Sequence, residues 1–359
     1  MQTAIKTNTS FFSVEKHSTK SYAQSSLPAI LSLFSGAGGL DLGFKLEGFG
    51  ISLAIDISHA AIKSHKRNFP NSNSVCANLI DLGPQGVLDA LLNNIPPKTK
   101  LGVIGGPPCQ GFSRANNQST ADDPRNTLPK LYIEIIKKLQ EVFEIEFIVF
   151  ENVLGIRDKK HAQTYSSLIH DIDLLGFDLN EHELCATDFG VPQTRKRIIL
   201  AAMSKGKGYL DVVPRKNTGI FTVKEAIGGL EPPVFYSKDI KSTEIPVHPN
   251  HWTMKPKSYR FSTPMEKWST SRRSFKVLKW DRPSPTIAFG NREIHVHPSA
   301  TRRISIYEAL ILQGFPKNFV LEGNLSEQVE QVSNAVPPPV ARSVAAAVKQ
   351  SLLKERHEF

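Results

Sequence analysis

A lone cysteine stands where a predicted strand ends. The apolar run at 101–104 is typical of a buried strand, and the glycines and prolines at 105–108 stop it, so Cys109 is expected in a loop at the strand's carboxyl end. Open α/β sheets place their chemistry at that edge. A single cysteine is more often a small buried hydrophobic residue. Here the sequence Pro-Pro-Cys-Gln favours a reactive thiol instead.

A carboxylate and two guanidinium groups have comparable positions further along the chain. Glu151 directly follows the apolar run at 147–150 and is expected at the end of another buried strand, where a functional and an ordinary surface role are equally plausible. Arg195 and Arg197 alternate at the start of a later strand, which places both on one face. This pattern fits a solvent-facing basic edge as well as a pair aimed at a phosphate or a carbonyl group.

A glycine turn near the start of the chain indicates a cofactor site. The predicted strand at 29–34 leads into the turn at 35–39 and then into an amphipathic helix, while Asp56 ends the next strand, 20 residues after Gly36. Such a carboxylate meets the hydroxyl pair of a ribose in nucleotide-binding folds. Asp41 stands where the dinucleotide fingerprint has its third glycine, and a carboxylate is unfavourable beside a pyrophosphate. The pattern therefore favours a nucleoside cofactor without phosphates, of which S-adenosylmethionine is the common one.

Strands and helices alternate along the chain, which predicts a parallel sheet and an α/β fold. A third strand region is expected around Val75 and Leu79, and a hairpin-like pair at 183–186 and 197–202. Helices are predicted at 86–92, 128–143, 165–175, 303–312 and 337–353.

The excess positive charge lies in one segment. Residues 205–303 contain 19 Lys and Arg against 8 Asp and Glu, whereas the rest of the chain is nearly neutral with 25 basic and 26 acidic residues. The same segment holds all three tryptophans, Trp252, Trp268 and Trp280. Basic residues interleaved with aromatic ones predict a face that binds a polyanion, and a merely solvated basic surface is the alternative. The change in composition also marks a second domain.

Composition places the chain among globular proteins. Its 359 residues, 40% of them hydrophobic, suffice for a substantial core, and three cysteines without paired spacing argue against disulfides or a zinc site. The sequence has no run resembling a membrane span or a secretory signal, so a cytoplasmic protein is expected. Residues 1–27 are expected to form a disordered extension, since the first 26 contain ten Ser or Thr; a mitochondrial transit peptide is the weaker interpretation.

Taken together, these stretches resemble the DNA (cytosine-5)-methyltransferase family. Six motifs occur in the family's usual order, and the resemblance covers about residue 28 to about residue 350. The motifs lie at 34–39 (FSGAGG), 107–110 (PPCQ), 151–153 (ENV), 193–197 (QTRKR), 308 with 313–316 (E and QGFP), and 331–336 (QVSNAV). Each alone has limited specificity, but their joint occurrence in this order makes coincidence improbable.

The resemblance implies a Rossmann-like, S-adenosylmethionine-dependent methyltransferase sheet, formed by residues 28–204 and 328–359, with a smaller irregular target-recognition domain at 205–327. It implies that Cys109 adds to C6 of cytosine and that Glu151 bonds N3 and the exocyclic amine. Arg197 would contact O2, with Arg195 as its phosphate-side neighbour. No metal is required by this chemistry.

The resemblance also assigns binding residues. Those implied for S-adenosylmethionine are Phe34, Gly36, Gly38, Gly39, Asp56, Asn78, Leu79, Pro108, Leu128, Asn334 and Val336. Those implied for DNA are Ser113, Arg114, Gln193, Thr286 and Ile287, and the loop at 113–125 would close over a cytosine flipped out of the duplex. Three positions depart from the family pattern: Asn78 replaces an acidic residue, Ser333 a glycine, and Asp56 a glutamate.

The expected partner is double-stranded DNA, bound by a monomer in the cytoplasm of a bacterium, in association with the nucleoid. The enzyme would modify a specific sequence, alone or paired with a restriction endonuclease whose cleavage it prevents. One alternative is the family's tRNA-methylating branch, whose Cys-Phe-Thr signature is missing because no cysteine follows Cys185. A second alternative is a DNA-binding regulator without activity, which would not need the thiol, acid and guanidinium groups together.

Overall fold

The computed structural model describes residues 27–108, 127–208, 210–213, 222–263, 276–287 and 295–354. Cys109, Ser113, Arg114 and the N-terminal segment 1–26 therefore lie outside the described residues. The predictions made for them from the sequence remain predictions.

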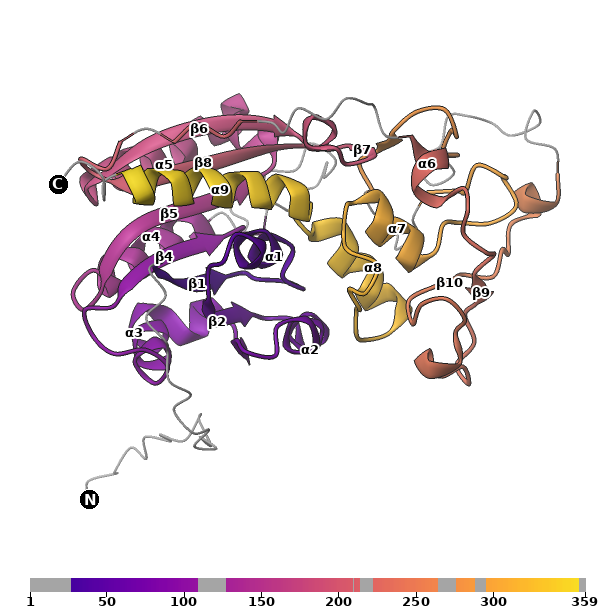
Figure 1. Cartoon of the computed structure of the whole chain (residues 1–359), viewed down its shortest axis with the longest axis horizontal. Coiled ribbons are helices and arrows are strands. Elements are labelled where there is room, and N and C mark those ends of the chain that lie inside the picture. Colours follow the sequence, from indigo (N-terminus) through magenta and orange to yellow (C-terminus); the bar gives the residue numbers. More distant parts are fainter. Residues whose placement is uncertain are drawn as a thin grey trace, which may run out of the picture.

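The described residues form a seven-stranded mixed sheet with helices on both faces (Figure 1). Its strand order is β3-β2-β1-β4-β5-β8-β6, in which the first five strands run parallel and β8 is antiparallel to both of its neighbours. The strands are β1 (Ala29–Leu33), β2 (Ile51–Asp56), β3 (Asn73–Cys76), β4 (Lys100–Gly105), β5 (Glu144–Asn152), β6 (Phe177–Cys185) and β8 (Lys196–Ser204). This confirms the predicted α/β class.

Two apolar cores lie on the two faces of the sheet. Alternate residues of β1 belong to different cores, with Ile30 on one face and Leu31 and Leu33 on the other, as the pleat of a strand requires. Helices α1 (Gly39–Leu46) and α9 (Pro338–Lys354) pack together on the Ile30 face. The other face is covered by α3 (Leu79–Leu92), α4 (Leu128–Leu139) and α5 (Ala162–Leu174).

The register of the parallel strands brings their carboxyl ends to one edge. Leu33 at the end of β1 pairs with Ile55 of β2 and with Gly105 of β4, and Gly105 pairs with Phe150 of β5. The residues that follow these four positions must therefore emerge side by side. The two predicted sites, one at the glycine turn and one at Glu151, share this edge, with the strand that leads to Cys109 between them.

A second lobe, formed by the described residues between 222 and 334, lies beside that edge (Figure 1). Its elements are short: α6 (Val223–Ile227), β9 (Val234–Phe235), β10 (Trp252–Thr253), β11 (Ser284–Pro285), α7 (Ile306–Leu312) and α8 (Leu325–Asn334). The core on the Ile30 face continues into this lobe, where it includes Trp252, Leu278 and Leu312. The lobe is thus packed onto the sheet domain, and the boundary predicted between 327 and 328 falls inside α8.

Several predicted elements differ from the observed ones. The third strand ends at Cys76, and Leu79 begins α3 instead, because the Asn78 side chain accepts a hydrogen bond from Ile80 N and starts the helix. The helix α2 (His59–Asn68) was not predicted, because its buried face consists largely of Ala, Ser and His side chains and carries no strong apolar period. Helix α8 was not predicted either, although Asn324 and Glu327 form a capping box and Leu325, Val329 and Val332 have helical spacing. In the part of the chain that the structure describes, no helix has the length and apolar character needed to span a membrane.

Candidate active site

The glycine turn after β1 is held against the end of β2 by a hydrogen bond. Gly36 N donates to Asp56 Oδ2 over 2.8 Å, so the turn and the carboxylate 20 residues later lie together, while the contact of Asp56 with a ribose stays a prediction. Gly36 has φ +54°, and a Cβ placed on it would have no atom within 4 Å, so the turn leaves open space above it. Phe34, which precedes this turn, also has a positive φ of 55°, an unfavourable conformation for a bulky residue that the surrounding structure must hold.

The Asp56 carboxylate combines burial with unused hydrogen-bonding capacity. Its second oxygen accepts from Ser58 N over 2.8 Å, so each oxygen has one backbone donor and retains a lone pair. Burial raises the pKa of Asp56 above its ordinary value, although the bonds from Ser58 and Gly36 act in the opposite direction. The carboxylate can therefore accept hydrogen bonds from a ligand hydroxyl pair.

Two exposed isoleucines, which the sequence did not single out, lie shortly after the ends of β2 and β3. Ile57 is 68% exposed directly after Asp56, and Ile80 is 52% exposed in the first turn of α3. Large apolar side chains left open to solvent beside a polar cleft can cover a planar apolar ligand. The signal that could have revealed Ile57 is its position immediately after a strand-end carboxylate.

Asn78 and Leu79 have structural roles at the start of α3. Asn78 Oδ1 caps the helix and its Nδ2 donates to Asp81 Oδ2 over 2.9 Å, while Leu79 is buried in the core on the α3 face. Asp81 was also missed. At position 78 the chain has Asn where the family pattern has an acidic residue. The carboxylate of Asp81, which is bonded to Asn78, provides an acidic group next to that position.

A buried polar network supports the glycine turn from below. His65 of α2 lies between two partners, with Nε2 3.1 Å from Asp41 Oδ1 and Nδ1 2.7 Å from Ser74 Oγ, and both Asp41 and His65 are fully buried. The glycine turn packs directly against the His65 and Phe69 rings, since a Cβ on Gly38 would lie 3.0 Å from His65 and 2.4 Å from Phe69. Asp41, interpreted from the sequence as unfavourable for phosphate, thus points into the protein and braces the turn.

The remaining predicted cofactor residues lie around the same edge. A Cβ on Gly39 would lie 2.4 Å from Val336 O, so the turn is packed against the segment that joins α8 to α9. Asn334 is exposed at the end of α8. Pro108 is partly buried at the end of the described β4 segment, and Leu128 is buried as the first residue of α4. These residues come from both faces of the sheet and lie around its carboxyl edge. Their contact with a ligand stays a prediction.

Glu151 and Arg197 form an ion pair at the end of β5. Arg197 Nε lies 2.9 Å from Glu151 Oε1, and both side chains are largely buried. The other carboxylate oxygen, Oε2, would be 2.9 Å from a Cβ on Gly106, the first residue after β4. The acid therefore borders the segment that leads to Cys109, so a charged pair and the predicted nucleophile belong to adjacent strand ends.

Arg195, Gln193 and Ile287 are all buried where the sheet domain meets the second lobe. Strand β7 (Gln193–Thr194) pairs with β11, Gln193 Oε1 accepts from Ile287 N over 3.3 Å, and Thr286 Oγ1 donates to Thr194 O over 2.8 Å. These residues join the two parts of the chain. The contact of Gln193, Thr286 and Ile287 with DNA remains a prediction, as do the catalytic roles of Arg195 and Arg197.

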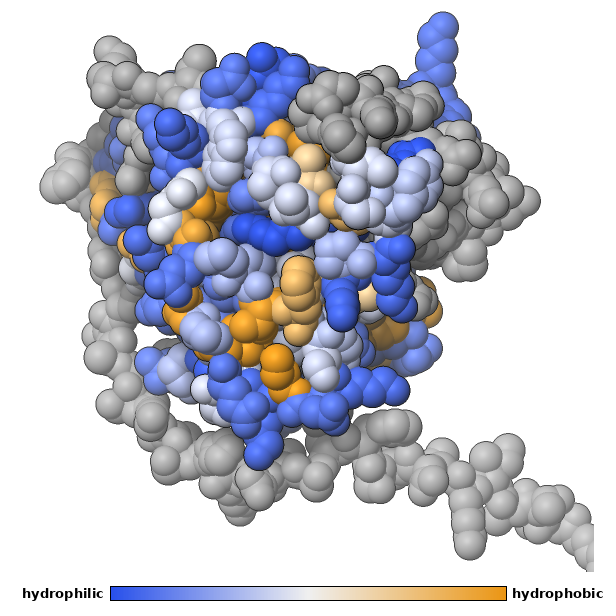
Figure 2. All heavy atoms as spheres, turned by 90° about the vertical axis from the view of Figure 1, so that its right-hand side faces the viewer, coloured by the Kyte–Doolittle hydropathy of each residue, from blue (hydrophilic) through white to orange (hydrophobic). Residues whose placement is uncertain are grey.

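The face of the second lobe that points away from the sheet carries both polar and apolar residues (Figure 2). Among the large hydrophobic side chains exposed in this lobe are Phe235, Met254 and Tyr259.

Comparison with known proteins identifies the kind of protein that this chain resembles. The family model for C-5 cytosine-specific DNA methylase matches residues 29–350. The type II methyltransferase M.MthTI of Methanothermobacter thermautotrophicus is 31% identical over 90% of this chain and 97% of its own length. The type II methyltransferase M1.HphI of Haemophilus parahaemolyticus is 32% identical over 89% of this chain and 86% of its own.

Two solved structures of methyltransferases have a similar fold. An E. coli prophage protein assigned as a DNA modification methyltransferase superposes with a TM-score of 0.73 at 26% identity, covering 91% of this chain and 100% of that one. A DNMT2 variant of Spodoptera frugiperda superposes with a TM-score of 0.61 at 20% identity over 90% of this chain and 100% of its own, which is a likeness of fold.

The network under the glycine turn predicts a stability effect. His65→Phe keeps a ring that can stack on Phe69 but removes both ring nitrogens, so the buried Asp41 carboxylate loses its partner. We expect a loss of about 3 kcal/mol in the free energy of unfolding, measured by urea denaturation. Lys66→Ala, on the exposed side of α2, should change it by less than about 0.5 kcal/mol. Adding Asp41→Asn to His65→Phe should recover part of the loss, and a wild-type stability of His65→Phe would contradict this role.

Proposed function

Because the chain belongs to the C-5 cytosine-specific DNA methylase family, we propose that it methylates C5 of a cytosine within a specific double-stranded DNA sequence, with S-adenosylmethionine as methyl donor. It is a DNA cytosine-5-methyltransferase of the restriction–modification type. The observation that carries the finer proposal is the shared edge of the sheet. The Asp56 turn and the Glu151–Arg197 pair lie at its strand ends, with β4 leading to Cys109 between them.

The residues of the glycine turn fit S-adenosylmethionine. Asp56 retains lone pairs for the two ribose hydroxyls, the open space above Gly36 admits a ligand close to the main chain, and Ile57 and Ile80 would cover the faces of the adenine ring. When bound, this group supplies an electrophilic methyl carried on a sulfonium. The other residues assigned to it from the sequence are Phe34, Gly38, Gly39, Asn78, Leu79, Pro108, Leu128, Asn334 and Val336.

The methyl group must be accepted by a carbon that is a poor nucleophile until the ring is activated. We propose that the Cys109 thiolate adds to C6 of cytosine, which makes C5 enamine-like and moves negative charge toward N3 and O2. Glu151 would then donate a hydrogen bond or a proton at N3 and accept one from the exocyclic amine. Arg197 would stabilise charge at O2 and, with Arg195, favour the thiolate. Once C5 carries the methyl group, its proton leaves to solvent and the Cys109 thiolate is eliminated from C6, which releases 5-methylcytosine.

Access to C6 requires that the cytosine leave the base stack, so we propose that the enzyme flips its target base into the edge of the sheet. The second lobe and the basic segment 205–303 would bind the duplex, with Ser113 and Arg114 in the loop that closes behind the flipped base and Thr286 and Ile287 near the recognition surface. Methylation at one sequence would protect the host DNA from a restriction endonuclease of the same specificity.

The thiol chemistry predicts a separation of binding from catalysis. Cys109→Ser should abolish methylation of plasmid DNA, because a serine hydroxyl is too weak a nucleophile to activate the ring. Bisulfite sequencing after expression in cells that lack cytosine methylation measures this. DNA binding should persist within about threefold of wild type, since binding does not require the thiol. The wild-type sample also identifies the target sequence. Residual turnover near the wild-type rate would overturn the assignment of Cys109.

The raised pKa of Asp56 predicts a pH-dependent cofactor affinity. Ribose hydroxyls bond most strongly to the ionised carboxylate, so binding must release the proton that the buried group holds at lower pH. The affinity should be greatest above the raised pKa and should fall by up to about tenfold per pH unit as the pH drops through and below it. Calorimetric titration with S-adenosylmethionine between about pH 7.5 and about pH 4.5 measures this. Asp56→Asn should bind weakly with a flatter profile, and a pH-independent wild type would contradict the proposed contact.

A further inference from the structure

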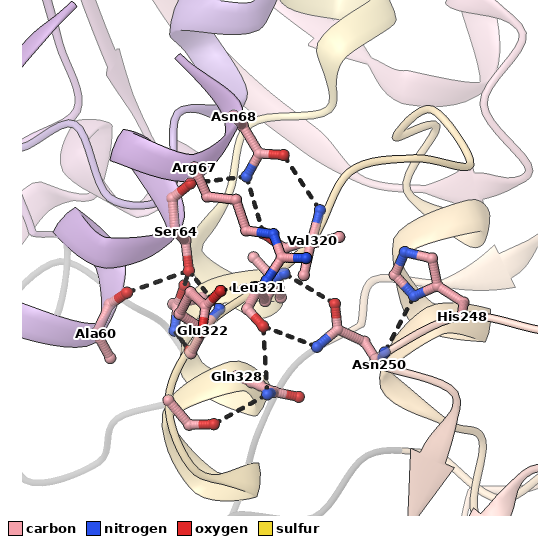
Figure 3. Close-up of polar contacts among 12 residues, drawn as sticks. Ala60, Ser64, Arg67, Asn68, His248, Asn250, Val320, Leu321, Glu322 and Gln328 are labelled. Atoms are coloured by element: carbon pink, nitrogen blue, oxygen red, sulfur yellow. Dashed lines mark hydrogen bonds and ion pairs between the residues drawn. The ribbon is translucent and has the colours of Figure 1, made fainter. Parts of the chain in front are cut away.

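Between α7 and α8, the chain crosses from the second lobe to α2 as an extended segment, residues 320–322 (Figure 3). This segment belongs to no strand, yet all six of its main-chain N–H and C=O groups are bonded to side chains. The partners come from both sides: some from α2 of the sheet domain, one from the turn before β10, and others from α8. We refer to residues 320–322 and these partners as the joint.

Asn68, the last residue of α2, binds one residue of the segment twice. Its Nδ2 donates to Val320 O over 2.8 Å, and its Oδ1 accepts from Val320 N over 3.2 Å. The same amide nitrogen donates to Ser64 O over 2.7 Å, one turn earlier in α2, which fixes the rotamer of Asn68. A side-chain amide that engages both polar groups of one residue replaces the pairing that a neighbouring strand would give.

Asn250 of the second lobe likewise bonds both main-chain polar groups of one residue, Leu321. Its Nδ2 and Oδ1 each lie 2.8 Å from their partners, Leu321 O and Leu321 N, and the side chain is 1% exposed. The Asn250 main chain is itself held, since its N–H donates to His248 Nδ1 and its C=O accepts from Tyr307 N of α7. Burial above all, together with electrostatic repulsion from neighbouring His251 and Arg67, lowers the pKa of His248 to about 4, so its ring is neutral and able to accept this bond near pH 7.

Glu322 completes the joint. Its N–H donates to Ser64 Oγ of α2 over 2.7 Å, and its C=O accepts from Gln331 Nε2 of α8 over 2.9 Å. The Glu322 carboxylate also pairs with Arg67 of α2 at 2.5 Å, but both side chains are more than a third exposed, so this ion pair is screened by solvent. The amide contacts, rather than the ion pair, carry the connection.

The position of α2 gives the joint its importance. This helix begins at His59, close to Asp56, and its Ser58 cap shares the Asp56 carboxylate with Gly36. Its other end is held by the joint. One helix therefore connects the proposed cofactor site to the lobe proposed to bind DNA.

We propose that Asn68 and Asn250 are positioning residues for methyl transfer: together they fix the second lobe relative to α2, so that the target cytosine of a duplex bound by the lobe reaches the edge of the sheet with its C5 close to the methyl group. The inference rests on the proposed function, because it needs DNA on the lobe and the cofactor beside Asp56. Neither residue touches the reacting atoms. A displacement of about 1 Å in a reacting geometry can lower a rate about 100-fold, which is the scale at which such a joint acts.

The test compares Asn68→Ala, Asn250→Ala and the double variant with Arg67→Ala as the matched control, all in the full chain. Hydrogen exchange, followed by mass spectrometry over residues 319–324, reports the joint without requiring activity. Methylation kinetics give kcat and the KM for DNA that contains the target sequence, and calorimetry gives the affinity for S-adenosylmethionine without DNA.

We expect faster exchange in the 319–324 segment and a fall of about 10- to 100-fold in kcat/KM for DNA in each asparagine variant, with cofactor affinity within about twofold of wild type. The double variant should lose less than the product of the two single losses, because both residues hold one segment. Arg67→Ala should leave kcat/KM within about twofold. Asn68→Ser, whose hydroxyl can still donate or accept one hydrogen bond, serves if Asn68→Ala does not fold and should lie between wild type and Asn68→Ala in kcat/KM.

Faster exchange with unchanged kcat and KM would overturn the inference, since the joint would then be merely structural. Unchanged exchange in both variants would overturn it as well, because the two side chains would not hold the segment. A wild-type enzyme that binds DNA but does not methylate it would instead contradict the proposed function, while the exchange measurement would still report on the joint.

Discussion

The hydrogen bond from Gly36 N to Asp56 Oδ2 joins the ends of β1 and β2, and the organisation of the site depends on it. It fixes the glycine turn with its amides near the edge of the sheet and orients a buried carboxylate whose other oxygen is held by Ser58 at the start of α2. Below the turn, the fully buried Asp41 and His65 form a support that leaves no room for a side chain at Gly38. The turn is therefore rigid before any ligand arrives, which lowers the entropic cost of binding.

The strand pairing of the sheet brings the Glu151 carboxylate and the Arg197 guanidinium beside the described segment that precedes Cys109, although these residues are far apart in sequence. Glu151 pairs with Arg197 across β5 and β8, and the segment after β4 runs beside Glu151 toward Cys109. The second lobe shares a continuous apolar core with this sheet and is bonded to α2 through Asn68 and Asn250. In this arrangement the lobe is held in a defined place relative to the site.

The sequence predicted the sheet and much of its edge, because apolar strands, glycine turns and strand-end carboxylates are local signals. The position of Asp56 at the end of β2 and the hairpin-like pairing of β6 with β8 were predicted in this way. The joint was not, since five of the six bonds to the main chain of residues 320–322 link residues 71 to 258 positions apart, through polar side chains that have no periodic pattern. Helix α2 escaped prediction because small and polar residues form its buried face. Gln193 shows a further limit of prediction from sequence. This motif residue, assigned to DNA, is fully buried in β7 where that strand pairs with β11, and only the tertiary structure reveals its burial.

The central claim is that this edge delivers a flipped cytosine to one particular thiol. Incubation with S-adenosylmethionine and duplex DNA that carries 5-fluorocytosine at the methylated position tests it directly, because fluorine at C5 blocks the final elimination and traps the adduct. The account predicts a denaturation-resistant protein–DNA complex that forms only with the cofactor, with the DNA attached to the peptide that contains Cys109. Attachment at Cys76 or Cys185, or no covalent complex from an enzyme that methylates the unfluorinated duplex, would contradict it.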